Sequence, residues 1–552
     1  MKITYIHPLF PDTLWSFRGI RSITGARTAF APLGLATAVA LTPDHWEIEI
    51  FDEEIEPINY DTDADLIAIT AFNVQAQRAY EIAKKFQKRG KPVVFGGPYA
   101  SLCPENVRPY FDTVISGECE YIWPEFLNDF KNGRQKDFYL QEEKVDMADS
   151  PLPAFDKLKA NAYQAFYVQT TRGCPFDCEF CDIIITDGRI PRVKSVEQVM
   201  AEVQNLMELG VRYVTFSDAN FIANTKFAKE LTHELIRFCE TNNYPISFAC
   251  EATLNLASKD ELLRLMQAAN FETVFIGIES PRMESLMETN KRQNTHHPIV
   301  HDVHKIQSYN MVVIAGMIVG FDNDDKNIFQ EQFDFLMEAG IPFTTSGILV
   351  AIEKTPLYLR MQREGRLLEY DYENQKAHGA ADINFIPKQM TREEILTGYN
   401  WLIRALYKYE NYSKRLITAM QNFTPGLTKF RQNRPFTTLK TPKILLNIAK
   451  HFIFTKNKKL RRFFFNTLKA SLMGHFSVRK FVEATSFMTL HKHFHEYISK
   501  THGDPETVGT LSPFSNDAYE RVVLPENDKF EIAKLAPEFK ENEAEISSTK
   551  ID

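Results

Sequence analysis

Short apolar segments alternate with amphipathic helical patterns along the first 145 residues. Apolar residues recur at helical spacing over 32–41 and 75–89, and short apolar runs of strand type occupy 2–7, 46–52, 65–70, 92–97 and 113–117. Alternating strands and helices predict a doubly wound, Rossmann-like parallel sheet. Ligands of such sheets bind beyond the carboxyl ends of the strands, which here are the loops 70–74, 96–101 and 116–120.

A second alternating region covers residues 160–385. Its helical patterns occupy 195–209, 225–242, 258–269, 297–309 and 326–339. Its predicted strands are 166–171, 213–217, 246–250, 273–278, 312–319 and 345–350. Ser195 is the expected N-cap of the first helix, and Gly210 follows its end. Together these segments make six β/α units.

The last part of the chain, from residue 386, is helical and then polar. Helical patterns cover 391–409, 445–455 and 460–473. Residues 401–500 carry 20 Lys and Arg against 3 Asp and Glu, although the whole chain has a net charge of −8. Such asymmetry marks a separate module with an anionic partner or surface. We expect a basic helical module over 386–502 and an acidic, partly disordered tail over 503–552.

Composition limits the class of protein. A chain of 552 residues with 44% hydrophobic and 25% charged residues is typical of a soluble protein with several domains. Seven cysteines form no even disulfide framework, which indicates a reducing compartment. The N-terminus reads as a strand, and the apolar run 311–321 is shorter than the roughly 20 residues that span a bilayer. We therefore expect a cytoplasmic protein without an integral membrane segment.

Three cysteines carry the strongest chemical signal. Cys174, Cys178 and Cys181 follow a predicted strand at C-x3-C-x2-C spacing. Thiolates are soft ligands that favour iron–sulfur clusters, zinc or copper(I). Three thiolates on one loop leave one iron of a 4Fe–4S cube open to a bound molecule. The alternative, a structural zinc loop, requires a fourth Cys or His nearby. The next cysteine, Cys239, is far along the chain.

This spacing, with Phe180 before the last cysteine, resembles the signature of the radical S-adenosylmethionine (SAM) superfamily. The resemblance implies that the three cysteines hold a 4Fe–4S cluster whose fourth iron is chelated by SAM. Electron transfer from the cluster, supplied by an external donor such as flavodoxin or ferredoxin, then cleaves SAM to a 5′-deoxyadenosyl radical. The six β/α units suit the partial (β/α)6 barrel of this superfamily.

Barrel enzymes place their functional residues at the carboxyl ends of strands. We expect Asp218 to support the SAM ammonium group and Glu251 to accept hydrogen bonds from ribose hydroxyls. Glycines would let backbone approach the adenine or methionine moiety. The cofactor-binding residues predicted at these strand ends are Asp218, Glu251, Gly277, Glu279 and Gly320.

The N-terminal region, residues 1–145, resembles the cobalamin-binding domain that precedes many radical SAM domains. Gly96 and Gly97, in Phe-Gly-Gly-Pro-Tyr-Ala-Ser, would lie against the cofactor. The region lacks the Asp-x-His-x-x-Gly loop whose histidine ligates cobalt in some such domains. His7 reads as a strand-end residue, so we expect a cobalamin lower face without histidine. The alternative is a Rossmann-like domain that binds another ligand or none.

The resemblance narrows to the cobalamin-dependent group that includes hopanoid methylases. The supporting segments are 181–184, 188–192 and 279–294, which includes Glu-Ser-Pro and Thr-Asn-Lys-Arg-Gln-Asn. It implies that the deoxyadenosyl radical removes hydrogen from an unactivated carbon, which then receives the methyl group of methylcobalamin. The substrate would be an apolar small molecule or a hopanoid-like lipid.

The sequence also allows two other functions and a contact with a membrane. A radical SAM enzyme that modifies RNA would use the basic module as its RNA-binding surface. A non-enzymatic cobalamin- or redox-sensing protein would use the module to bind nucleic acid. We expect no nucleic-acid partner. Basic residues beside aromatic faces instead predict peripheral contact of residues 401–500 with the inner face of a membrane. A solvated basic face that covers the barrel explains the same pattern.

Overall fold

The N-terminal sheet has six parallel strands in the order β3-β1-β4-β5-β6-β7. Their bounds are β1 Lys2–His7, β3 Glu47–Asp52, β4 Leu66–Thr70, β5 Val93–Gly96, β6 Thr113–Ser116 and β7 Phe138–Leu140. The chain moves from β1 to β3 on one side and then crosses to β4 on the other. The predicted doubly wound sheet is therefore confirmed, and β7 extends it by one strand.

Helices cover both faces of this sheet because alternate residues of each strand point to opposite sides. On β4, Leu66 and Ala68 belong to one apolar core, whereas Ile67 and Ile69 belong to the other. The first core includes α2 (Leu33–Ala40) and α6 (Cys119–Lys131). The second includes α3 (Ala76–Gln87), α4 (Pro98–Leu102) and α5 (Pro104–Val107).

The computed structural model describes residues 1–368, 382–425, 441–473 and 478–515. Residues Met1–Phe514 form one unit. The acidic tail predicted over 503–552 lies outside the described residues from 516 onward.

A second sheet has seven parallel strands in the order β15-β14-β13-β12-β11-β8-β2. The strands are β2 Thr28–Phe30, β8 Tyr163–Val168, β11 Tyr213–Phe216, β12 Ser247–Ala252, β13 Phe271–Glu279, β14 Val312–Val319 and β15 Phe343–Ile348. Six of them are the predicted barrel strands. The seventh, β2, comes from the N-terminal region and pairs with β8. Its three residues are too few to give a periodic signal.

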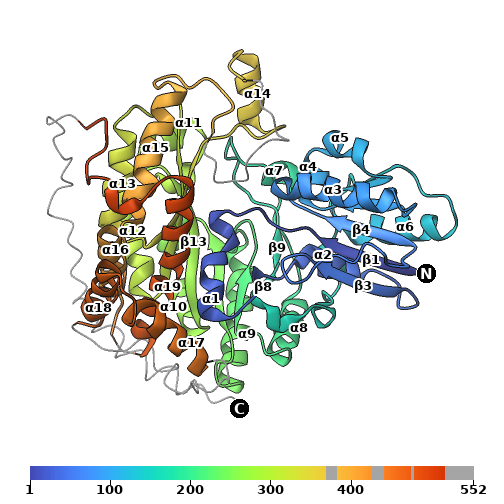
Figure 1. Cartoon of the computed structure of the whole chain (residues 1–552), viewed down its shortest axis with the longest axis horizontal. Helices are drawn as coiled ribbons and strands as arrows, with labels where there is room; N and C mark the ends of the chain where they lie inside the picture. Colours follow the sequence, from blue (N-terminus) through green and yellow to red (C-terminus); the bar gives the residue numbers. More distant parts are fainter. Residues whose placement is uncertain (369–381, 426–440, 474–477, 516–552) are drawn as a thin grey trace. The chain divides into compact units, whose positions relative to one another are not determined.

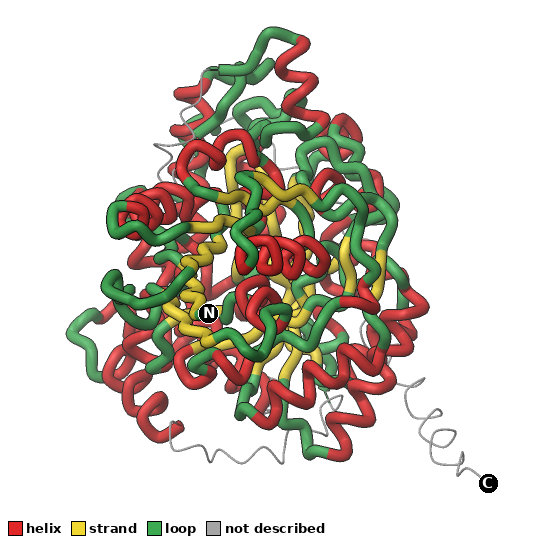
Figure 2. The backbone as a smooth tube through the Cα atoms, turned by 90° about the vertical axis from the view of Figure 1, so that its right-hand side faces the viewer, coloured by secondary structure: helices red, strands yellow, loops and turns green. Residues whose placement is uncertain are grey.

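Helices follow the barrel strands, as predicted, and enclose them (Figures 1 and 2). They are α8 Val196–Glu208, α9 Thr225–Thr241, α10 Asp260–Ala268, α11 Met283–Glu288, α12 Ile299–Ser308, α13 Ile328–Ala339 and α14 Pro356–Arg363. Ser195 caps α8, since its hydroxyl accepts from Gln198 N–H while the Gln198 side chain accepts from the Ser195 backbone. This reciprocal capping box fixes where α8 begins.

The predicted strand 166–171 differs in the structure. Strand β8 ends at Val168, and a separate strand β9 (Thr171–Arg172) pairs antiparallel with β10 (Arg192–Val193). The chain therefore leaves the barrel sheet before it reaches the cysteines. The loop between β9 and β10 contains all three cysteines and the short helix α7 (Ile183–Thr186).

The C-terminal module consists of helices that pack on one another and on the end of the barrel. They are α15 Arg392–Tyr407, α16 Tyr409–Gln421, α17 Thr441–Ile448, a π-helical stretch Ala449–Ile453, α18 Lys458–Leu472 and α19 Val478–Thr501. Helix α15 packs on α13 and on β15, and α19 packs on the N-terminal segment Arg18–Ile20. No helix in the described ranges has the length and apolarity needed to cross a membrane.

Candidate functional site

The cysteine loop, residues 173–181, begins at a position that only glycine accommodates. Gly173 has φ +94°, and a Cβ there would lie 2.7 Å from the carbonyl oxygen of Ile190. Cys174 N–H donates to the carbonyl of Gly188 (3.1 Å), and Cys181 N–H donates to that of Cys178 (3.1 Å). All three thiols are free, with Cys178 buried and the other two half-buried. The backbone thus holds three thiols on one short loop, with none of them in a disulfide.

No group of three or more His, Cys, Asp or Glu side chains surrounds a single metal position within the described part of the chain. A 4Fe–4S cube does not need such convergence, because each of its cysteines binds a different iron.

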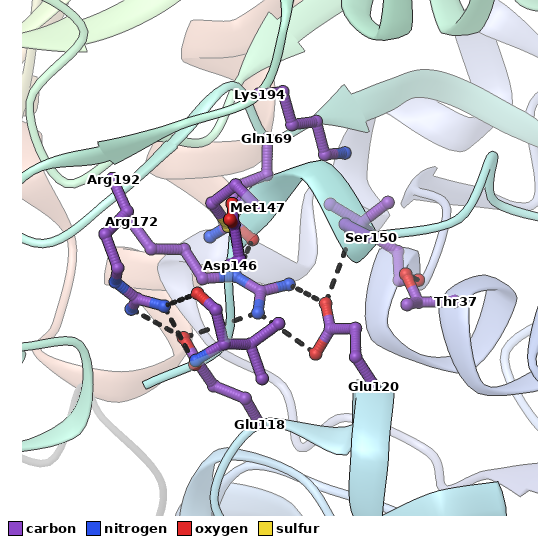
Figure 3. Close-up of polar contacts among 12 residues, drawn as sticks. Thr37, Glu118, Glu120, Asp146, Met147, Ser150, Gln169, Arg172, Arg192 and Lys194 are labelled. Atoms are coloured by element: carbon purple, nitrogen blue, oxygen red, sulfur yellow. Dashed lines mark hydrogen bonds and ion pairs between the residues drawn. The ribbon is translucent and has the colours of Figure 1, made fainter. Parts of the chain in front are cut away.

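The two strands that flank the cysteine loop are bound to the N-terminal sheet by buried ion pairs. Arg172 of β9 donates to both oxygens of Glu120 (2.7 and 3.2 Å), and Arg192 of β10 donates to both oxygens of Glu118 (2.7 and 2.9 Å). Figure 3 shows both arginines pointing toward these two glutamates. Glu118 is the N-cap of α6 and Glu120 lies in its first turn, within the segment 116–120 that was predicted as a ligand-binding loop. The cysteine loop is therefore fixed to the carboxyl edge of the N-terminal sheet.

Asp218 lies beneath the entry to the cysteine loop and is completely buried. Its carboxylate accepts hydrogen bonds from the N–H and hydroxyl of Thr170 (both 2.6 Å) and from the N–H of Thr171 (2.8 Å). Burial raises the pKa of Asp218 to about 6, while these hydrogen bonds act in the opposite direction. The structure therefore shows Asp218 holding the turn between β8 and β9; its predicted contact with SAM remains a prediction.

Glu251, at the end of β12, has a carboxylate with no hydrogen-bond or ion-pair partner among the described residues. Burial and the neighbouring charge of Asp218 raise the pKa of Glu251 to about 7. The Glu251 side chain is half-buried, so its carboxylate oxygens can accept hydrogen bonds from a ligand that supplies donors. Glu251 therefore fits a ligand with hydroxyl or amino groups, such as SAM.

The end of β13 carries a group of buried polar residues. Glu279 accepts a hydrogen bond from the ammonium of Lys291 (2.9 Å), and a Cβ at Gly277 would collide with the Glu279 carboxylate. The Gln293 side-chain amide donates to the sulfur of Cys178 (3.5 Å). The predictions included Gly277 and Glu279 but missed Lys291 and Gln293. The segment 279–294 served only as a family marker, because the burial of Lys291 and Gln293 is seen only in the structure.

The end of β14 is fastened to the cysteine loop through α14. Arg360 donates to both oxygens of Glu179 (2.7 and 2.9 Å) and to Asp322 (2.7 Å). Gly320 has φ +104°, and its N–H donates to Asp324 (2.9 Å). Burial raises the pKa of Asp324 to about 7. Gly320 thus shapes a turn at the strand end, and its predicted contact with SAM stays a prediction.

At the N-terminal sheet, Gly97 and Gly96 differ. Gly97 has φ +103°, and a Cβ there would lie 2.6 Å from the Thr70 hydroxyl oxygen, whereas a Cβ at Gly96 would meet nothing closer than 3.8 Å. Gly97 thus lets the loops after β4 and β5 approach each other. At Gly96, by contrast, no neighbouring atom requires the absence of a side chain. His7 contacts Asp52 (3.5 Å) and Gln75 (3.4 Å) at the end of β1.

Comparison with known proteins places these features in a family. The model of the Radical SAM superfamily matches residues 168–336, and that of a domain of unknown function (DUF4070) matches residues 355–507. The chain is 36% identical to the uncharacterized methyltransferase sll1242 of Synechocystis sp., over 75% of this chain and 78% of that protein. It is 34% identical to the hopanoid C-2 methylase of Rhodopseudomonas palustris, over 67% of this chain and 72% of that protein.

Solved structures show the same fold at low sequence identity. The cobalamin-dependent SAM radical enzyme OxsB superposes with a TM-score of 0.56 at 14% identity, over 90% of this chain and 80% of that one. The radical SAM methyltransferase TsrM from Kitasatospora setae has a TM-score of 0.52 at 15% identity, over 66% and 76%. Members of the superfamily use a 4Fe–4S cluster and SAM, and they need a reductant. The chain belongs to the radical SAM superfamily, in the group of methyltransferases that includes the hopanoid C-2 methylase.

Proposed function

We propose that this protein is a cobalamin-dependent radical SAM C-methyltransferase that acts on an unactivated carbon of an apolar, polycyclic small molecule. The observation that carries the proposal is the three-cysteine loop fixed between the two α/β regions. When bound, the cofactors supply hydrogen abstraction and the methyl group. The protein orients them and keeps water away.

Cys174, Cys178 and Cys181 would ligate the cluster. The Glu251 carboxylate would accept hydrogen bonds from the ribose hydroxyls of SAM. Gly277, Glu279 and Gly320 lie at neighbouring strand ends and would line the rest of the SAM site. Asp218 would act by holding Thr170 and Thr171, and through them the start of the cysteine loop.

Cobalamin would lie on the carboxyl edge of the N-terminal sheet, against Gly96 and Gly97. Contacts between this edge and the barrel support that position. The Cys103 thiol lies 3.1 Å from the Glu353 carboxylate, and Lys354 donates to the carbonyl of Leu102 (2.6 Å). His7 is engaged by Asp52 and Gln75, so a lower face without histidine fits this sheet.

The apolar character of the substrate is supported by aromatic side chains on the inner face of the barrel sheet. Phe30 of β2 stacks on Tyr167 of β8, with ring centroids 4.5 Å apart. Trp15 is 44% exposed and lies 6.1 Å from the ring of Phe275 on β13. Aromatic rings that remain partly exposed at a barrel's inner face suit an apolar ligand with a rigid ring system.

Names of relatives point to the same substrate class. The matched relatives include a hopanoid C-2 methylase and, at 27% identity over 75% of this chain and 90% of that protein, the bacteriochlorophyllide d C-12(1)-methyltransferase of Chlorobaculum tepidum. We propose a substrate with fused or linked rings, and a low-potential donor of the flavodoxin or ferredoxin class as the source of electrons.

The test is methyl transfer from SAM that carries a deuterated methyl group. The reconstituted protein, with cobalamin and a reductant, is incubated anaerobically with a lipid extract of its host. We expect a polycyclic lipid that gains the labelled methyl group only when cobalamin is present. Label in no lipid, or label that appears without cobalamin, contradicts the proposal.

A second proposal concerns the C-terminal module, which we propose contacts an anionic membrane. Phe454 is 73% exposed and Phe465 on α18 is 50% exposed. Exposed basic residues lie beside them, namely Lys456, Lys458, Lys459 and Arg462. Aromatic and basic side chains on one surface suit a lipid interface. Co-sedimentation with anionic vesicles at moderate salt, reduced by a combined Phe454→Ala and Phe465→Ala change, is the expected result; no binding contradicts it.

A further inference from the structure

A buried cation lies beside the cysteine loop. The ammonium of Lys291 forms an ion pair with Glu279 (2.9 Å), and both side chains are 9% exposed. The same ammonium lies 5.9 Å from the ring centroid of Phe180, the residue that directly precedes Cys181 in the chain. A buried ion pair is costly to desolvate, so its presence at this position calls for a reason.

Backbone irregularities place this pair where it is. Glu279 has φ +69°, a left-handed conformation that is rare outside glycine. The register between β13 and β14 shifts between Gly277 and Glu279. A side chain at 277 would occupy the position of the Glu279 carboxylate. Strained backbone is found mainly at functional sites, because the surrounding structure must stabilise it.

Gln293 connects this group directly to a cysteine. Its amide N–H donates to the Cys178 sulfur (3.5 Å), while its buried carbonyl oxygen has no hydrogen-bond partner among the described residues. Asn294 is held by donation to the carbonyls of Gly277 (2.9 Å) and Ile278 (3.2 Å). The segment after α11 is thereby fixed to the end of β13, with Lys291 and Gln293 directed toward the cysteine loop.

Lys291 is the member of the ion pair that lies against the cysteine loop. Its ammonium is 5.9 Å from the ring centroid of Phe180, the residue before Cys181. Burial lowers the pKa of Lys291, but the neighbouring Glu279 acts in the opposite direction, and that pKa stays above its usual value. A charged ammonium therefore lies beside the cysteine loop, and Glu279 compensates its charge.

We propose that Lys291 and Gln293 are positioning residues that raise the reduction potential of the cluster, and that Glu279 limits this effect. Reduction adds one electron from an external low-potential donor to the cluster and its thiolates, and no bond forms or breaks. A nearby cation and an N–H donor to sulfur stabilise the more negative, reduced state. The inference rests on the proposed function only in requiring a cluster on the three cysteines.

The test is a redox titration of the reconstituted holoprotein, followed by the electron paramagnetic resonance signal of the reduced cluster. For Lys291→Met we expect about a tenfold lower ratio of reduced to oxidised cluster at a fixed potential, which is a shift of about −59 mV for one electron. For Glu279→Gln we expect a shift of opposite sign, because the ammonium is then uncompensated. Gln293→Met, which removes the N–H donor at similar size, should shift the potential in the same direction as Lys291→Met.

Controls separate this effect from a loss of structure. Lys305→Met on α12 removes an ion pair with Asp260 of α10 (2.8 Å) and should titrate like the unmodified protein. Iron content is measured for each variant; if Lys291→Met holds no cluster, Gln293→Met decides the outcome. Unchanged potentials in cluster-loaded variants, or shifts of the same sign for Lys291→Met and Glu279→Gln, overturn the inference. Absence of a cluster in the unmodified protein would instead refute the proposed function.

Discussion

Arg172 donates to both carboxylate oxygens of Glu120, at 2.7 and 3.2 Å, and so joins the strand before the first cysteine to the start of α6. The Glu120 side chain is 1% exposed and that of Arg172 is 13% exposed. A buried ion pair adds little net stability, because desolvation of the two charges offsets their attraction. Removing one partner is nevertheless costly, because the other charge is left buried and unpaired. The pair thereby sets the distance between the cysteine loop and the N-terminal sheet.

Arg172→Met should destabilise the protein by about 3 kcal/mol, because Glu120 and Glu118 lose a buried cation. The midpoint of urea unfolding of the apoprotein measures the effect. Lys414→Met is the matched control; it removes an exposed pair with Glu410 on α16 and should cost less than about 1 kcal/mol. Equal midpoints for the two variants would contradict the role given to Arg172.

Cys178→Ala should abolish cluster assembly, because two thiolates cannot hold a cube that needs three. Iron and sulfide analysis after anaerobic reconstitution measures this. Cys239→Ala is the control, since Cys239 is buried in α9 away from the loop and should retain full iron content. A Cys178→Ala protein with the iron content of the unmodified protein would refute the ligand assignment.

Glu251→Gln should weaken SAM binding about 10- to 100-fold, the value of one hydrogen bond to a charged group. Equilibrium binding to the cluster-loaded protein measures it. Glu261→Gln, on the exposed face of α10, should bind SAM like the unmodified protein. Equal affinity of both variants would remove Glu251 from the SAM site.

The same residue predicts a pH dependence of apoprotein stability. The pKa of Glu251 in the folded state, about 7, is higher than the ordinary value of 4.5, so the folded state binds the proton more tightly. Its contribution to stability is therefore complete below about pH 4.5 and is lost as the pH rises through about 7. Glu251→Gln should be more stable than the unmodified apoprotein by up to about 3 kcal/mol at pH 8 and not at pH 4.5. A difference independent of pH would contradict the assignment.

Trp15→Ala should reduce methylation without reducing SAM cleavage, since we assign its partly exposed ring, beside Phe275, to the proposed substrate pocket and to no cofactor. We expect a KM for the lipid at least about tenfold higher, from the loss of apolar contact area. Leu140→Ala, an equally exposed apolar position on β7, is the control. Loss of SAM cleavage in Trp15→Ala would show that its role lies elsewhere.

The pattern of apolar residues was sufficient to locate most strands of both sheets, because buried parallel strands are continuous apolar runs bounded by turn residues. It was insufficient for β2, which is three residues long, and for the break between β8 and β9. That break depends on Asp218, whose hydrogen bonds to Thr170 and Thr171 join residues 47 and 48 positions apart. Such pairings follow from tertiary packing and leave no local pattern.

The candidate site was predictable to a similar degree. The sequence places Glu251 and Gly277 at strand ends, and the structure has them at the carboxyl ends of the neighbouring strands β12 and β13; their contact with SAM remains a prediction. Lys291 and Gln293 could not be assigned, because their role depends on a left-handed residue at 279 and on a register shift between strands. Neither feature can be read from residue types alone.

The central claim is that the cysteine loop holds a cluster that cleaves SAM reductively. The most direct measurement is 5′-deoxyadenosine formed under anaerobic conditions from SAM and dithionite by the reconstituted protein and by Cys178→Ala. We expect 5′-deoxyadenosine from the unmodified protein and none above background from the variant. No 5′-deoxyadenosine from the cluster-loaded protein with its substrate present, or equal amounts from both proteins, would contradict it.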